Sequence, residues 1–121
     1  MEIIELSAKE VKRLIIHYYE DMLNYDIYVK EIISVQDGKT NIQIFLCEDM
    51  ENERWSLLTY DEIKTVLTNY ANELNYDLES FIFFAGVDSK DDHMVPTFEG
   101  IRLNVKKKGL KKLLSENEKA S

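Results

Sequence analysis

The tetrapeptide Leu-Asn-Tyr-Asp occurs twice in the sequence, at residues 23–26 and again at 74–77, an offset of 51 positions. Each copy follows a run of apolar residues at helical spacing, and each run begins with a capping-box motif. The motifs are Ser7-Ala8-Lys9-Glu10 and Thr59-Tyr60-Asp61-Glu62, again offset by nearly the same interval. Because helix start and helix end recur together, the sequence indicates an internal repeat. A chain with such a repeat is expected to fold as two similar units.

Each unit is predicted to contain a strand, an amphipathic helix and a hairpin. The turn signals Asp37-Gly38-Lys39 and Asp88-Ser89-Lys90 are expected to close the two hairpins. The expected elements are, in order, a strand at 2–6, a helix at 8–24, a strand at 27–36, a partner strand with Ile42, Ile44 and Leu46, a strand at 55–58, a helix at 60–75, a strand at 79–87, and a partner strand with Ile101, Leu103 and Val105.

This order predicts a single α+β domain, residues 1–121, built from tandem β-α-β-β units at 2–48 and 54–106. The strands are expected to form an antiparallel sheet that is packed by the two amphipathic helices. The tail, 106–121, is predicted to form a short basic helix built on Leu110, Leu113 and Leu114.

The strand at 79–87 is apolar at both alternating positions, from Phe81 to Val87, which favours a central place in the sheet. Two helices can cover only one of its faces. The other face is expected to be covered within the monomer or by a second copy or partner, so monomer and homodimer both stay open. Tyr25 and Tyr76 are candidate interface anchors as well as candidate core residues.

Length and composition indicate one globular domain. The chain has 121 residues, of which 45% are hydrophobic, and no apolar run approaches the roughly 20 residues of a membrane-spanning helix. The N-terminus lacks the basic-then-apolar layout of a signal peptide. The single cysteine, Cys47, excludes an intramolecular disulfide and is typical of a reducing compartment. We therefore expect a cytoplasmic protein with no membrane partner.

Charge is divided unevenly, because residues 1–100 hold 21 acidic and 8 basic residues while 101–121 hold 2 and 7. The net charge of −8 argues against direct nucleic-acid binding by the acidic body. Two acidic clusters are either solvated loops or a surface for a basic partner. We take them as the candidate partner-binding residues: Glu48, Asp49, Glu51 and Glu53 in the first cluster, and Asp88, Asp91 and Asp92 in the second.

Catalytic chemistry is poorly represented in the sequence. His17 is spaced for a surface pair with Asp21 on a helix, and Cys47 closes an apolar strand with no base placed beside it. Asp88, Asp91, Asp92 and His93 carry metal-binding atom types, but their spacing does not match a calcium loop. Neither a phosphate loop nor a nucleophile elbow occurs. We expect no enzymatic activity, no cofactor and no metal.

The small acidic chain opens with Glu5-Leu6-Ser7-Ala8-Lys9-Glu10-Val11-Lys12-Arg13-Leu14-Ile15-Ile16, and it resembles small proteins of phages and mobile elements of low-GC Gram-positive bacteria. Among these it resembles type II anti-CRISPR proteins in size, acidity and lack of catalytic motifs. The resemblance implies stoichiometric inhibition by DNA mimicry, with carboxylates occupying the basic groove where an RNA-guided nuclease holds DNA.

Three alternatives stay open. An immunity protein that plugs a basic nuclease toxin would need the same charge distribution. A small metal-dependent hydrolase would use the aspartates 88, 91 and 92 with His93. A structural or oligomerisation module would use the apolar strand at 79–87.

Overall fold

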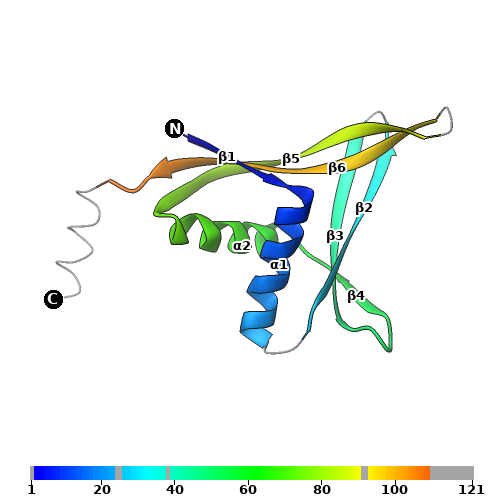
Figure 1. Ribbon diagram of the computed structural model, residues 1–121, viewed down its shortest axis with the longest axis horizontal. Helices are drawn as coiled ribbons and strands as arrows, with labels where there is room; N and C mark the ends of the chain where they lie inside the picture. Colours follow the sequence, from blue (N-terminus) through cyan, green and yellow to red (C-terminus); the bar gives the residue numbers. More distant parts are fainter. Residues whose placement is uncertain (1, 24–25, 38, 91–92, 110–121) are drawn as a thin grey trace.

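The computed structural model describes residues 2–23, 26–37, 39–90 and 93–109, and over these residues it confirms an α+β fold with two helices (Figure 1). The two helices lie beneath one sheet, which extends as a long hairpin beyond them, and beside a second sheet. In chain order the elements are β1 (Glu2–Ser7), α1 (Ala8–Leu23), β2 (Tyr28–Gln36), β3 (Lys39–Asp49), β4 (Arg54–Leu57), α2 (Tyr60–Glu73), β5 (Tyr76–Lys90) and β6 (His93–Lys107).

The strands of the described residues form two antiparallel sheets of three strands each, with orders β1-β6-β5 and β2-β3-β4. The prediction of one common sheet is therefore wrong. The first strand of each half leaves its own hairpin and pairs with the hairpin of the other half. In one sheet Leu6 of β1 lies opposite Ile101 of β6, and in the other Leu57 of β4 lies opposite Phe45 of β3. These pairings between strands far apart in the sequence therefore hold the two halves of the chain together.

The prediction that the strand at 79–87 is central is also wrong, because β5 is an edge strand and β6 is central. Ile101, Leu103 and Val105 of β6 have no exposed surface, whereas Ile82 of β5 is 51% exposed. Both faces of β5 are apolar for different reasons. Phe81 packs on the helix side, while Phe84 lies beneath the Arg102 guanidinium, with 5.5 Å from Cζ to the ring centre.

Both helices begin at the predicted capping residues. At α2 the box is complete: the Glu62 amide donates to the Thr59 hydroxyl at 3.2 Å, and the Thr59 amide donates to the Glu62 carboxylate at 3.0 Å. At α1 the Glu10 amide donates to the Ser7 hydroxyl at 3.2 Å, and this hydroxyl in turn donates to the Glu10 carboxylate at 3.1 Å. Ser7 still pairs with Gly100 in the sheet, so a strand runs directly into a helix there.

The predicted ends of the helices and hairpins are confirmed in part. Helix α1 ends at Leu23 and α2 is capped by Leu74, the same position of each tetrapeptide, but Asn24 and Tyr25 lie outside the described residues. The turn at Asp37 is confirmed, with a φ of 52°. The turn predicted at 88–90 is wrong, because these residues continue β5 opposite β6. The predicted C-terminal helix, with Leu110, Leu113 and Leu114, also lies outside the described residues.

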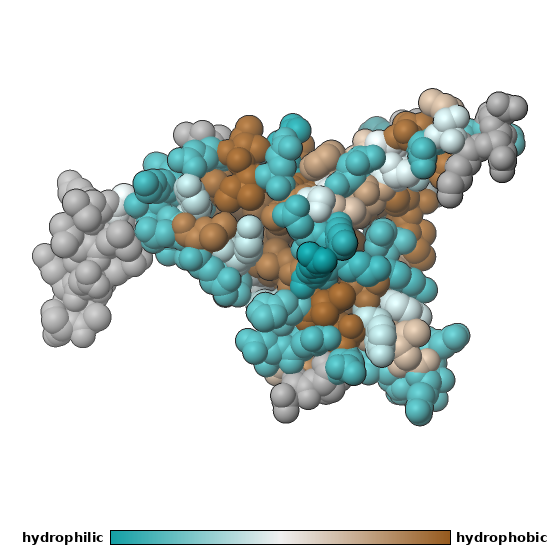
Figure 2. Space-filling model, viewed as in Figure 1, coloured by the Kyte–Doolittle hydropathy of each residue, from teal (hydrophilic) through white to brown (hydrophobic). Residues whose placement is uncertain are grey.

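The core lies between the helices and the inner faces of both sheets. Its fully buried side chains come from both halves of the chain: Val11 and Ile15 of α1, Val66 and Leu67 of α2, and Ile101, Leu103 and Val105 of β6. Figure 2 shows polar side chains over most of one face, with apolar areas along the β1-β6-β5 sheet and where it approaches β2 and β3. Within the described ranges, neither helix is long and apolar enough to cross a membrane.

Candidate partner-binding surfaces

The first acidic cluster forms the turn between β3 and β4. The pairing of these strands shifts register between Cys47 and Asp49, and such a bulge interrupts the hydrogen-bond ladder and bends the strand locally. Glu53 closes the turn in the left-handed region, at a φ of 49°, and its amide donates to the Met50 carbonyl at 3.3 Å. Glu48, Glu51 and Glu53 are exposed and Asp49 is half-buried, so the turn presents clustered negative charge.

Asp49 is held in place by Asn52. The side-chain amide of Asn52 donates to the Asp49 carboxylate at 2.6 Å, and the Asn52 backbone amide donates to it at 3.4 Å. These hydrogen bonds favour the ionised form and hold the pKa of Asp49 below its usual value. The carboxylate therefore keeps its charge at neutral pH and sets the shape of the turn.

The second cluster lies in a different part of the molecule. Asp88 is exposed near the end of β5, while Asp91 and Asp92 lie outside the described residues. In Figure 1 the end of the β5–β6 hairpin and the β3–β4 turn are at separate extremities. The structure does not bring Asp88 together with the first cluster.

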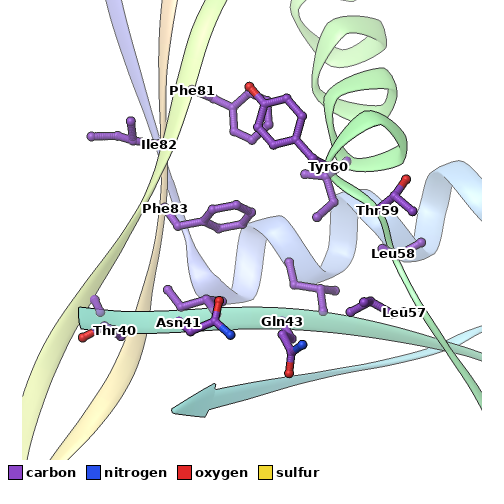
Figure 3. Close-up of a pocket in the computed structure, with 14 residues that line it drawn as sticks. Thr40, Asn41, Gln43, Leu57, Leu58, Thr59, Tyr60, Phe81, Ile82 and Phe83 are labelled. Atoms are coloured by element: carbon purple, nitrogen blue, oxygen red, sulfur yellow. The ribbon is translucent and has the colours of Figure 1, made fainter. Parts of the chain in front are cut away.

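A groove of about 810 Å³ lies between β3, β5 and the start of α2 (Figure 3). Phe81 and Phe83 point from β5 toward Tyr60 at the start of α2, and β3 runs along the opposite side. The Tyr60 and Phe81 rings are stacked, with 4.9 Å between centres, although the Tyr60 side chain is 59% exposed. The groove therefore has an aromatic wall on the side of β5 and α2, and it is open to solvent.

None of the residues that line the groove is charged: they are Thr40, Asn41, Ile42, Gln43, Ile44, Leu57, Leu58, Thr59, Tyr60, Ile63, Phe81, Ile82, Phe83 and Ala85. Thr40, Asn41, Gln43 and Thr59 supply polar groups at its sides. The sequence does not reveal this surface, because the residues that line it come from three separate segments of the chain. The one signal in the sequence is the run from Phe81 to Phe84, which is apolar at both alternating positions and equally favours a central strand.

The remaining sequence candidates lie in separate places. His17 and Asp21 are exposed and line a recess of about 320 Å³ between α1 and α2. His93 is exposed at the start of β6, and Cys47 is fully buried opposite Tyr28 and Trp55.

Tyr76, a candidate interface anchor, is half-buried and donates to the Glu2 carboxylate at 2.6 Å, an interaction that raises the pKa of its phenol. It joins β5 to β1 across the central strand.

Metal-binding side chains do not gather anywhere in the part of the chain that the structure describes, where no three His, Cys, Asp or Glu residues are placed to hold an ion. The metal-site candidate at 88–93 includes two aspartates outside that part. Comparison with known proteins adds no family: neither a protein-family model, nor a curated protein, nor a solved structure matches this chain.

Proposed function

We propose that this chain is a non-enzymatic binding protein that inhibits a basic nucleic-acid-handling protein by stoichiometric binding. The observation that carries the proposal is the β3–β4 turn, where four carboxylates fall within six residues and three of them are exposed. Asp49 accepts a hydrogen bond from the Asn52 side chain, which holds the carboxylate in place. The turn therefore presents clustered carboxylates to a basic surface.

Charge would act mainly on the rate of encounter. The net charge of −8 attracts a positively charged partner over distances near the screening length, and the exposed turn offers the final contact. An RNA-guided nuclease, which holds DNA in a basic channel, is the partner that anti-CRISPR-like mimicry requires. Carboxylates in that channel would exclude DNA without any chemical step.

We also infer that the chain is a tandem duplication of one β-α-β-β unit. The element order repeats, both helices begin at a capping box, and β1 and β4 each pair with the second hairpin strand of the opposite half. Superposition of residues 8–39 on 59–90 tests this: similar chain paths would support the duplication, and unrelated paths would refute it.

The functional proposal is tested with a purified guide-loaded type II RNA-guided nuclease. The inhibitor variant neutralises the turn with Glu48→Gln, Asp49→Asn, Glu51→Gln and Glu53→Gln. We expect wild type to block DNA cleavage near a one-to-one ratio, and the variant to associate about tenfold more slowly because its steering charge is lost. Raising the salt to about 0.5 M should slow wild type in the same way, since screening shortens to well below about 10 Å.

The matched control removes four exposed carboxylates elsewhere, with Asp21→Asn, Glu31→Gln, Glu73→Gln and Glu79→Gln. It changes the net charge equally, so a slower association seen only with the turn variant assigns the contact to the turn. A basic nuclease toxin is assayed in parallel, and inhibition of the toxin alone would identify an immunity protein. Binding that neither the turn variant nor salt alters would exclude electrostatic recognition.

A further inference from the structure

The groove between β3 and β5 exposes the edges of two strands. Side chains of a strand alternate between its two faces, yet consecutive residues of both strands line this groove: 40–44 of β3 and 81–83 of β5. A cavity that contacts both faces of a strand must lie beside its edge. The backbone N–H and C=O groups that point outward along these edges are therefore directed at the groove.

Neither edge has a strand partner on that side among the described residues. The β1-β6-β5 sheet ends at β5, and β4 covers β3 only from Phe45 onward. The last hydrogen bond on this side of β3 runs from the Leu58 amide to the Ile44 carbonyl, at 2.9 Å. Between two register shifts, β5 keeps a regular stretch from Ser80 to Phe84, about 17 Å long.

Between its two register shifts, the edge of β5 carries no protective side chain. Exposed edges in natural proteins commonly carry lysine, proline or inward-pointing charge, which discourage pairing with other chains. The segment Phe81-Ile82-Phe83-Phe84-Ala85 carries none of these. Such a segment favours β-pairing, so an unprotected edge here is consistent with a partner that covers it.

The corresponding place in the other half of the chain is closed. There the start of α1, β2 and β6 converge around Val11, Val29 and Phe98, and the crevice between them is too narrow to admit a water molecule. On the open side the same three kinds of element, the start of α2, β5 and β3, leave about 810 Å³. β2 is also an edge strand, but only the side of β3 and β5 leaves room for an added strand.

We propose that the groove binds an extended, uncharged segment of the protein partner as an added β-strand. This inference rests on the proposed function, since it specifies how the basic partner is held. The uncharged lining disfavours a charged insert, whose desolvation would be uncompensated. The net charge of −8 favours basic residues on either side of the inserted segment. Backbone pairing supplies affinity and the aromatic side chains select the apolar residues.

The test uses a synthetic peptide with the centre Thr-Val-Thr-Val-Thr-Val in two forms, one with two lysines at each end and one with two serines. Each is titrated into the ¹⁵N-labelled full chain. We expect saturable shifts of the amides at 40–43 and 80–85, with a midpoint below about 1 mM, and slower hydrogen exchange there. N-methylation of alternate peptide amides should weaken binding about tenfold or more, since it removes the added-strand hydrogen bonds.

Two exposed positions of β5 provide matched variants. Ala85→Lys places a chain and a charge in the groove and should weaken binding of the serine-flanked peptide at least tenfold. Val87→Lys makes the same change two residues beyond the lining and should leave that binding unchanged. Equal binding of the N-methylated peptide, or shifts that avoid both edges, would overturn the inference.

The two proposals fail separately. The serine-flanked peptide should bind the four-carboxylate turn variant as well as it binds wild type, because the turn does not line the groove. Failure of the nuclease assay with intact peptide binding would refute the proposed function alone. Nuclease inhibition without any peptide binding at the two edges would refute the groove as the binding site.

Discussion

Gly100 shows how one residue determines the junction of β1 and α1. Its φ is 150°, in a region that side chains rarely adopt, and a Cβ there would collide with the Leu6 carbonyl oxygen. Gly86 differs, because a Cβ at that position would meet the side chain of Glu99, which can move. The sequence shows both as glycines inside strands, and only the neighbouring backbone distinguishes their roles.

At this scale we predict that Gly100→Ala lowers the free energy of unfolding by about 2 kcal/mol or more, since the strained backbone and the clash must be relieved. Urea denaturation measures the change. Gly109→Ala is the control, because a Cβ there meets nothing within 4 Å, and it should stay within about 0.5 kcal/mol of wild type. Equal losses at both positions would contradict the close packing of β1 against β6.

At the scale of elements, the two long strands have different roles. β6 lies between β1 and β5, and its inward side chains are fully buried, whereas β5 has a neighbour on one side only. Leu103 illustrates the first role, with no exposed surface, and Ile82 the second, at 51% exposed. Burial on β6 therefore stabilises the sheet, while the edge of β5 is available for contact.

We predict that Leu103→Ala destabilises the fold by about 2–5 kcal/mol, the range for a buried large-to-small change that leaves a cavity. Ile82→Ala should cost less than about 1 kcal/mol, because half of its side chain is already in water. Thermal or urea unfolding of both variants measures the comparison. A larger cost at Ile82 than at Leu103 would restore β5 as the core strand.

At the scale of the whole molecule, the exchange of first strands makes the halves interdependent. β1 completes the sheet that contains the second hairpin, and β4 completes the sheet that contains the first. Arg102 of β6 forms an ion pair with Glu5 of β1, at 2.9 Å, across one of these two strand pairs. Each half alone would expose a strand edge and an apolar face.

We predict that fragments 1–52 and 53–121, divided within the β3–β4 turn, are each largely unfolded, and that an equimolar mixture recovers the circular dichroism of the intact chain. The physical reason is that neither fragment contains a complete three-stranded sheet. Size-exclusion chromatography of the mixture should show one complex. A cooperative unfolding transition in either isolated fragment would contradict this interdependence.

The sequence by itself determined the local structure. Both helices begin where Ser7 and Thr59 can accept hydrogen bonds from residues three positions later, and the first hairpin turns at Asp37. Alternating burial on β3 and β6 also follows the predicted apolar positions. These features depend on residues close together in the chain, so spacing alone predicts them. The acidic turn was identified as a cluster for the same reason.

Only the tertiary structure decided how the strands combine. A strand that is apolar on both sides can lie at the centre of a sheet or at an edge beside a groove, and the pattern from Phe81 to Phe84 is the same in both. The choice depended on β6, whose buried residues lie about twenty positions further on, and on β1 at the other end of the chain. Pairing between distant segments depends on which apolar side chains are buried across the whole molecule, so a local sequence pattern cannot predict it. The groove arises from that outcome.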